Sequence, residues 1–154
     1  MHPGNISINT TAHSKTAVLL KVSQLLNLNY PELLVNVLFD AFLKRENMGS
    51  TAIGHGIIIP HIRSDFISKT CACVLKLQSP VDFGAMDKQP VDLVLALVVP
   101  QHEADQHLQT LSDIIIQFSP PEFRHACRRV NNSGELYKLL TAKPAAATNQ
   151  LETQ

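Results

Sequence analysis

Residues 50–61 read STAIGHGIIIPH. Two glycines are followed by three consecutive isoleucines and then by a proline, which is the pattern of a loop that enters a buried strand. Proline has no backbone N–H and a fixed φ, so the strand is expected to stop at Pro60. His61 then follows directly on the end of that strand, where an α/β sheet presents functional side chains to the surface.

On both sides of this stretch, helix and strand patterns follow one another along the chain. The expected elements are a strand over residues 5–10, a helix after Ser14, a second helix from Pro31 to Gly49, strands over 71–77 and 91–99, and helices over 104–118, 121–127 and 133–140. Near-continuous apolar runs such as residues 91–99 are typical of strands that helices cover on both faces. The sequence therefore predicts an α/β fold: a three-layer α/β/α sandwich with a small mixed β-sheet, in the order β-α-α-β-β-β-α-α-α.

Apolar residues at helical spacing indicate which faces these helices are expected to bury. The first helix has Val18, Leu19, Val22, Leu25 and Leu26, the second has Leu34, Val37, Leu38, Ala41 and Phe42, and the helix over 104–118 has Leu108, Leu111, Ile114, Ile115 and Phe118. Ser14 is of the residue type that caps helix N-termini, so the first helix is expected to begin directly after it.

The composition is that of one globular domain. A chain of 154 residues with 45% hydrophobic and 17% charged residues is sufficient for a single core. We expect the domain to span residues 5–141, with flexible termini at 1–4 and 142–154. The formal net charge is zero, which argues against a nucleic-acid-binding protein and against a polybasic membrane patch.

No segment marks the chain for export or for insertion into a membrane. The longest apolar run, residues 91–100, contains Asp92 and is shorter than the roughly 20 residues that cross a bilayer. The first residues lack a basic region followed by an apolar run. The three cysteines at positions 71, 73 and 127 are odd in number and lie in apolar surroundings, so they are interpreted as reduced core thiols of a cytoplasmic protein.

Two histidines and one arginine are the candidate reactive residues. The imidazole of His61 has a pKa near neutrality, so its neutral form is an available nucleophile, although a Pro-His pair alone is also compatible with a structural histidine. His107 lies in the first turn of the helix over 104–118, where the helix N-terminus favours a nearby anion; the alternative is a histidine at the core rim. The guanidinium of Arg45 has the shape to bind phosphate, or it pairs with the helix C-terminus.

The loop before His61 is a second candidate for binding an anion. Ser50, Thr51, Gly54 and Gly56 are small residues whose backbone N–H groups could cradle a phosphate, although the Gly-Lys-Ser/Thr run of a Walker A motif is absent. The histidines lack the spacing of a metal site, so no metal and no cofactor are expected. A short basic cluster is expected to be a solvated helix face or a protein-docking patch: Arg124, His125, Arg128 and Arg129.

Residues 45–61, RENMGSTAIGHGIIIPH, together resemble the active-site signature of the fructose/mannitol-type IIA domains of the bacterial phosphoenolpyruvate-dependent phosphotransferase system. The resemblance covers about residues 5–141. It implies that His61 is phosphorylated on Nε2 and that Arg45 and His107 assist it. Residues 87–93, DKQPVDL, leading into ALVVP at 96–100, resemble the nitrogen-regulatory branch of this family.

Three positions depart from the pattern of the family. His55 stands where asparagine is usual, Ile58 where alanine is common, and Ile62 where a small residue usually follows the active histidine. A protonated His55 could help to hold phosphate, so His55 joins the loop residues as a candidate phosphate ligand. The bulk of Ile62 is expected to narrow the approach to His61.

The resemblance implies a phosphocarrier that accepts its phosphoryl group from a phosphohistidine carrier of the HPr or NPr kind. Three functions stay open: nitrogen- or potassium-type regulation, sugar-specific transfer to a IIB permease component, and a binding module that is no longer phosphorylated. The expected partners are the donor, with Phe66 and Ile62 forming an apolar docking rim, and then regulatory target proteins or a IIB component. Nucleic acid and direct membrane insertion are not expected, and a homodimer is left open.

Overall fold

The computed structural model describes residues 3–102 and 104–142. The elements, in chain order, are the 3-10 helix η1 (Pro3–Asn5), β1 (Ile6–Thr10), α1 (Lys15–Asn29), α2 (Val35–Asn47), β2 (Ala52–Gly54), β3 (Ile57–Ile58), β4 (His61–Ser64), β5 (Cys71–Val81), β6 (Val91–Pro100), α3 (Ala104–Gln117), α4 (Pro121–Arg129) and α5 (Ser133–Thr141). The predicted flexible segments lie largely outside the described residues. Among the described residues, no helix has both the length and the apolar character that crossing a bilayer requires.

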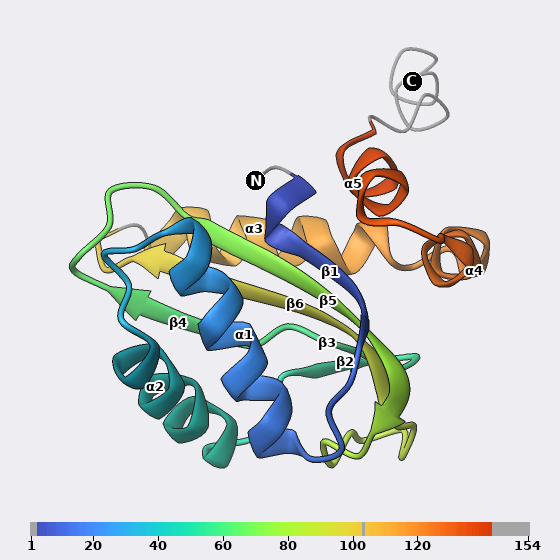
Figure 1. The fold of residues 1–154 in the computed structure, drawn as a ribbon, viewed down its shortest axis with the longest axis horizontal. Coiled ribbons are helices and arrows are strands. Elements are labelled where there is room, and N and C mark those ends of the chain that lie inside the picture. Colours follow the sequence, from blue (N-terminus) through green and yellow to red (C-terminus); the bar gives the residue numbers. More distant parts are fainter. Residues whose placement is uncertain (1–2, 103, 143–154) are drawn as a thin grey trace.

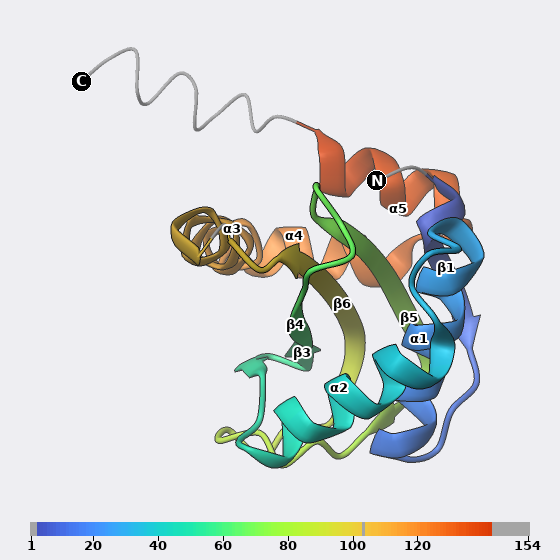
Figure 2. The same cartoon turned by 90° about the vertical axis from the view of Figure 1, so that its left-hand side faces the viewer.

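The strands form one mixed sheet in the order β1-β5-β6-β3-β2, with β4 also paired to β6. The pairs β1–β5, β3–β6 and β4–β6 are parallel, whereas β5–β6 and β2–β3 are antiparallel. Helices α1 and α2 lie on one side of this sheet, and α3, α4 and α5 lie on the other (Figures 1 and 2). The predicted three-layer α/β/α architecture is therefore confirmed.

The strand that was expected to stop at Pro60 is instead interrupted there. β3 pairs with Leu93 and Val94 of β6, and β4 resumes along the same edge of β6 from Leu97 onward. Pro60 cannot donate a hydrogen bond, but its carbonyl accepts one from the Leu97 N–H at 2.9 Å. As a result, His61 is the first residue of a new short strand rather than a residue beyond the sheet.

The Gly-rich loop is a tight hairpin between β2 and β3. Gly54 pairs with Ile57, and the two turn residues between them, His55 and Gly56, have positive φ values of 58° and 79°. Two positive φ values are characteristic of the type I′ turn, for which Asn-Gly is the preferred pair. This geometry explains why asparagine suits position 55, and histidine is among the residues that tolerate the same backbone region.

The buried stripe of α1 is confirmed, but the expected faces of α2 and α3 need correction. Ser14 caps α1 as predicted, accepting a hydrogen bond from the Ala17 N–H at 3.1 Å. Leu34, directly before α2, is 56% exposed, and Val37 within the helix is 51% exposed. The helix begins at Val35 rather than at Pro31 and buries a narrow stripe at four-residue spacing, which is formed by Leu38, Phe42 and Glu46.

Helix α3 likewise buries less than its sequence pattern predicts. Leu108 and Ile115 are exposed, whereas Phe118, directly after the helix, is buried. Leu111 and Ile114 pack against the core on this side of the sheet as half-buried residues. A helix that contacts a sheet with only one face buries a stripe of residues at three- and four-residue spacing. Apolar residues outside that stripe face outward.

Candidate functional site

His61 is held at the start of β4 by a contact to its own chain. The ring is half-buried, and its Nδ1 lies 2.7 Å from the carbonyl oxygen of Ile59. A carbonyl can only accept, so this contact places the proton of the neutral ring on Nδ1. Nε2 is then left with a lone pair, which is the form in which an imidazole acts as a nucleophile.

His107 comes from α3, far away in the sequence, and lies beside His61. The two ring centroids are 5.0 Å apart and the rings are tilted by 47°. The side chain of His107 is only 7% exposed, and its Nδ1 is buried without a hydrogen-bond partner among the described residues. Because buried N–H groups without a partner are rarer than unpaired acceptors, this favours the ring form with its proton on Nε2. In that form His107 is a hydrogen-bond donor.

The two histidines line a cavity of about 480 Å³ at the sheet edge formed by β4, with walls contributed by α2 and α3. Its lining residues are Ala41, Lys44, Arg45, Met48, His61, Ile62, Arg63 and His107. Arg45 donates from Nη1 to the Gly49 carbonyl at 3.0 Å, which ties its guanidinium to the end of α2. The structure thus brings the three predicted reactive residues together from three separate elements.

The sequence analysis missed Arg63, which also lines this cavity. It follows His61 by two residues on β4, so the two side chains share one face of the strand. Its positive charge lowers the pKa of both His61 and His107, which places the guanidinium near both rings. Period-two alternation from His61 would have been the signal for it in the sequence.

The environment favours the neutral form of both rings. Burial is the largest cause that lowers the pKa of His61 below its usual value, the hydrogen bond to Ile59 opposes it, and the charge of Arg45 adds to it. Burial also lowers the pKa of His107, followed by the charges of His61 and Arg63. Two neutral imidazoles beside two guanidinium groups form a site suited to an anion.

We predict that His61 and His107 titrate with midpoints below 6.5, the usual value for histidine. At a pH between the folded and unfolded midpoints, the unfolded chain binds more protons than the folded chain, so the free energy of unfolding falls as the pH falls below 6.5. An NMR titration of the ring protons gives the midpoints, which belong to the coupled pair. Urea unfolding between about pH 7.5 and 5.5 gives the stability. A midpoint above 6.5 for either ring would contradict the prediction.

The predicted phosphate-binding loop does not line the cavity of His61. The backbone N–H and the hydroxyl of Thr51 both bond to the buried carboxylate of Glu46, at 3.1 and 2.7 Å. The hydroxyl oxygen of Ser50 accepts the Ala52 N–H at 3.1 Å. These groups are bonded to the last turn of α2 and within the loop, because a short chain segment that leaves a helix must satisfy its backbone donors.

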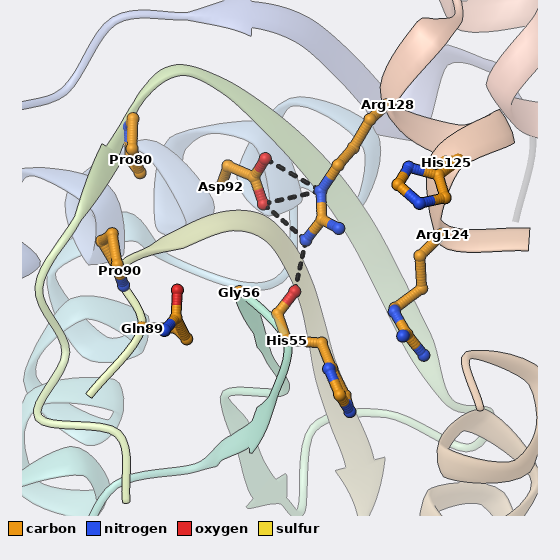
Figure 3. A pocket seen from close by; sticks show the side chains of 9 residues that line it. All are labelled: His55, Gly56, Pro80, Gln89, Pro90, Asp92, Arg124, His125 and Arg128. Carbon is orange, nitrogen blue, oxygen red and sulfur yellow. Dashed lines mark hydrogen bonds and ion pairs between the residues drawn. The ribbon is translucent and has the colours of Figure 1, made fainter. Parts of the chain in front are cut away.

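His55 and Gly56 line a different pocket, shown in Figure 3. The His55 N–H donates to Asp87 at 2.9 Å, and its carbonyl accepts from Arg128 of α4. Arg128 also pairs with Asp92 at 2.9 Å. Gly54, at the base of the same turn, lies against the carboxylate of Asp87. The hairpin is therefore fastened to α4 and to the loop before β6 rather than directed at His61.

The basic cluster is partly structural rather than a uniformly solvated face. Arg124 is buried, and its Nη1 donates to the carbonyls of Phe118 and Ser119 at 2.8 and 2.7 Å, which satisfies the C-terminal end of α3. Arg128 holds the hairpin, as described above. His125 and Arg129 are the exposed members of the cluster. Among the described residues, no three His, Cys, Asp or Glu side chains form a group that could hold a metal ion.

Comparison with known proteins shows the family to which the chain belongs. The sequence model for the family "Phosphoenolpyruvate-dependent sugar phosphotransferase system, EIIA 2" matches residues 1–143. A nitrogen regulatory protein of Pseudomonas aeruginosa is 34% identical over 138 residues, which are 90% of each chain.

Two solved structures share the fold. The nitrogen regulatory protein IIA-Ntr of Neisseria meningitidis has a TM-score of 0.86 at 28% identity, over 91% of this chain and 95% of the other. The mannitol IIA enzyme of Escherichia coli, solved as a complex with phosphorylated IIB, has a TM-score of 0.75 at 19% identity, over 93% and 98%. On the match across nearly its whole length, the chain belongs to the EIIA type 2 family of the phosphoenolpyruvate-dependent sugar phosphotransferase system.

Proposed function

We propose that this protein is a phosphocarrier that accepts a phosphoryl group on Nε2 of His61 from a phosphohistidine of a small HPr- or NPr-type protein. The observation that carries the proposal is the 2.7 Å contact between His61 Nδ1 and the Ile59 carbonyl. It leaves Nε2 as the nucleophilic nitrogen beside a cavity that His107, Arg45 and Arg63 also line. The phosphotransferase family to which the chain belongs consists of components of such phosphoryl relays.

In the proposed step, the bond from phosphorus to the donor nitrogen breaks as the bond to His61 Nε2 forms. The donor imidazole leaves with the electron pair of the old bond and keeps the proton on its other nitrogen. His61 keeps its own proton on Nδ1, where the Ile59 carbonyl stabilises the charge that the ring acquires. No net proton transfer is needed, so the remaining requirement is stabilisation of the phosphoryl oxygens in a loose, in-line transition state.

Three groups around the cavity meet that requirement. His107 donates from Nε2, while Arg45 and Arg63 provide positive charge from the α2 side and from β4 itself. Hydrogen-bond donors that are fixed in place before the reaction stabilise the transition state more than water molecules do, because they need no reorganisation. Ile62, between His61 and Arg63 on β4, packs partly against the core below α1 and α2 and also contributes to the lining of the cavity.

An apolar groove of about 350 Å³ adjoins the cavity and is the proposed docking surface for the donor. It shares Ala41, Ile62 and Arg63 with the cavity, so a protein bound there reaches His61. The groove is lined with apolar surface by Leu34 and Val37 at the N-terminal end of α2 and by Phe66, which is 75% exposed. Exposed apolar side chains gathered next to a reactive group are typical of a protein-interaction site.

We place the exchange in the cytoplasm, where the three buried free cysteines would stay reduced. For the output of the carrier, regulation is the first candidate, because the Pseudomonas aeruginosa relative is a nitrogen regulatory protein. Transfer of the phosphoryl group to a IIB component is the second, because the mannitol IIA enzyme was solved in complex with phosphorylated IIB. A binding module without phosphorylation is the third.

Mass spectrometry after incubation with phosphoenolpyruvate tests the proposal. The protein is incubated separately with the general enzyme and carrier of the sugar-type system and with those of the nitrogen-type system. We expect it to take up one phosphoryl group, faster from the nitrogen-type carrier if its role is regulatory. Omission of the carrier is the control. No uptake from either pair would remove the phosphocarrier function and leave the binding module.

A further inference from the structure

The last turn of α2 carries a buried carboxylate next to the His61 cavity. Glu46 is only 4% exposed, and its charge acts on His61. Both of its oxygens accept hydrogen bonds from Thr51, at 3.1 Å from the N–H and at 2.7 Å from the hydroxyl. Burying a carboxylate costs free energy that an apolar side chain of the same size would avoid. Its presence here therefore indicates a role beyond stability.

Thr51, which Glu46 holds through these two hydrogen bonds, is itself bonded to the backbone beside His61. Its carbonyl accepts the Ile59 N–H at 3.1 Å, and the Ile59 carbonyl is the group that takes the Nδ1 proton of His61 at 2.7 Å. Ile59 lies in the gap between β3 and β4. Its N–H is held by Thr51, the residue directly before β2.

We propose that Glu46 is a positioning residue for His61, which acts through Thr51 and Ile59 to hold the carbonyl that fixes the ring with its proton on Nδ1. The buried side chain of Ile59 sets where this segment lies, and the bonds from Glu46 to Thr51 set how its peptide groups are oriented. Without them, His61 exchanges more freely with the ring form that carries its proton on Nε2. That form has no lone pair on the nitrogen that would attack phosphorus.

The expected effect on phosphoryl transfer rests on the proposed function, whereas the expected effect on the ring form of His61 does not. One set of variants can therefore test the positioning role of Glu46 separately from the phosphocarrier function. Glu46→Gln replaces one acceptor oxygen by an amide that cannot accept from Thr51, and Thr51→Val removes the hydroxyl while keeping the shape. Thr51→Ser keeps both donors and is the matched control. Ser50→Ala is the second control, because it removes a different hydrogen bond of the same loop.

The test is NMR of the full chain labelled with ¹⁵N in its histidines, at a pH well above 6.5, with spectra that distinguish the two neutral ring forms. Thermal unfolding of each variant verifies that it is folded. In the wild type and both controls we expect His61 to carry its proton on Nδ1. In Glu46→Gln and Thr51→Val we expect the Nε2–H form to become comparably populated. Phosphoryl uptake should then fall about twofold with an unchanged KM for the donor protein, since about half of the His61 rings would lack the lone pair on the attacking nitrogen.

An unchanged ring form of His61 in both folded variants would overturn the proposal. If Glu46→Gln does not fold, Thr51→Val decides by itself. A shift of the ring form in Thr51→Ser or Ser50→Ala would also overturn it, because any disturbance of the loop would then have the same effect. If the ring form shifts as expected but no donor phosphorylates even the wild type, the role of Glu46 stands and the proposed function fails.

Discussion

Replacing His61 with alanine is expected to abolish the uptake of phosphate from phosphoenolpyruvate and the general carriers. The substitution removes Nε2, the nitrogen that is left with a lone pair when Nδ1 donates to Ile59. His107, the other histidine of the cavity, does not offer an equivalent nucleophile, because its Nδ1 is buried and its Nε2 carries the proton in the ring form that the burial favours. Intact-protein mass spectrometry measures the result directly.

The fold should survive this substitution. His61 is half-buried and makes one hydrogen bond to the backbone, so its loss should cost about 1 kcal/mol of stability. His13→Ala is the matched control, because His13 is an exposed histidine in the loop between β1 and α1. It should take up phosphate at the wild-type rate. If His61→Ala still incorporates phosphate while folded, another residue is the acceptor and the central assignment is wrong.

Replacing His107 with alanine has the second largest expected effect, a slowing of phosphoryl uptake by about 10²- to 10³-fold, the usual result of losing one fixed donor to a developing anion. The rate should fall with little change in KM, since His107 lies at the reacting group and not in the apolar docking groove. Stopped-time mass spectrometry over a range of donor concentrations separates the rate from KM.

Leu108→Ala is the control for the loss of a side chain from the same turn of α3, because Leu108 is exposed and lies outside the cavity lining. It should leave the uptake rate close to that of the wild type. Circular dichroism and thermal unfolding establish that both variants are folded. A wild-type rate in folded His107→Ala would remove His107 from the mechanism and leave Arg45 and Arg63 as the groups that bind the phosphoryl oxygens.

The regulatory and sugar-specific functions differ in the partner that comes after His61. Under the proposed function both would use the cavity of His61 and the adjoining groove, so the experiments that separate them concern the partners. The regulatory and sugar-specific functions are separated by which carrier donates the phosphoryl group and by which protein receives it from His61. The homodimer that the sequence left open stays a prediction.

Patterns within one element were predicted well. The cap at Ser14, strand β6 and the extent of α3 follow from residue type and period, which depend on neighbours in the chain. Strand β5 begins at Cys71 as predicted but continues to Val81 instead of ending at residue 77. Faces of helices were predicted less well, as the exposed Leu34 and Val37 show. A helical pattern gives an apolar stripe, but the neighbouring elements decide how much of the stripe is covered.

The interruption of β3 and β4 at Ile59 and Pro60 could not be read from the sequence. It depends on the alignment of this segment with β6, which is distant in the chain, and on the position of the Thr51 carbonyl relative to Ile59. The surroundings of the small-residue loop also depend on distant residues. Its composition suits a phosphate cradle, whereas in the structure Glu46 and Asp87 accept the N–H groups of Thr51 and His55.

By itself, the sequence determined the fold class and singled out His61, His107 and Arg45, because the strand, proline and helix signals around them are local and strong. Only the tertiary structure decided that these three residues share one cavity, that Arg63 joins them, and that Glu46 is connected to His61 through two backbone carbonyls. The physical reason is that hydrogen bonds and burial act between atoms that are near in space, and β4 meets α2 and α3 only after the sheet has formed.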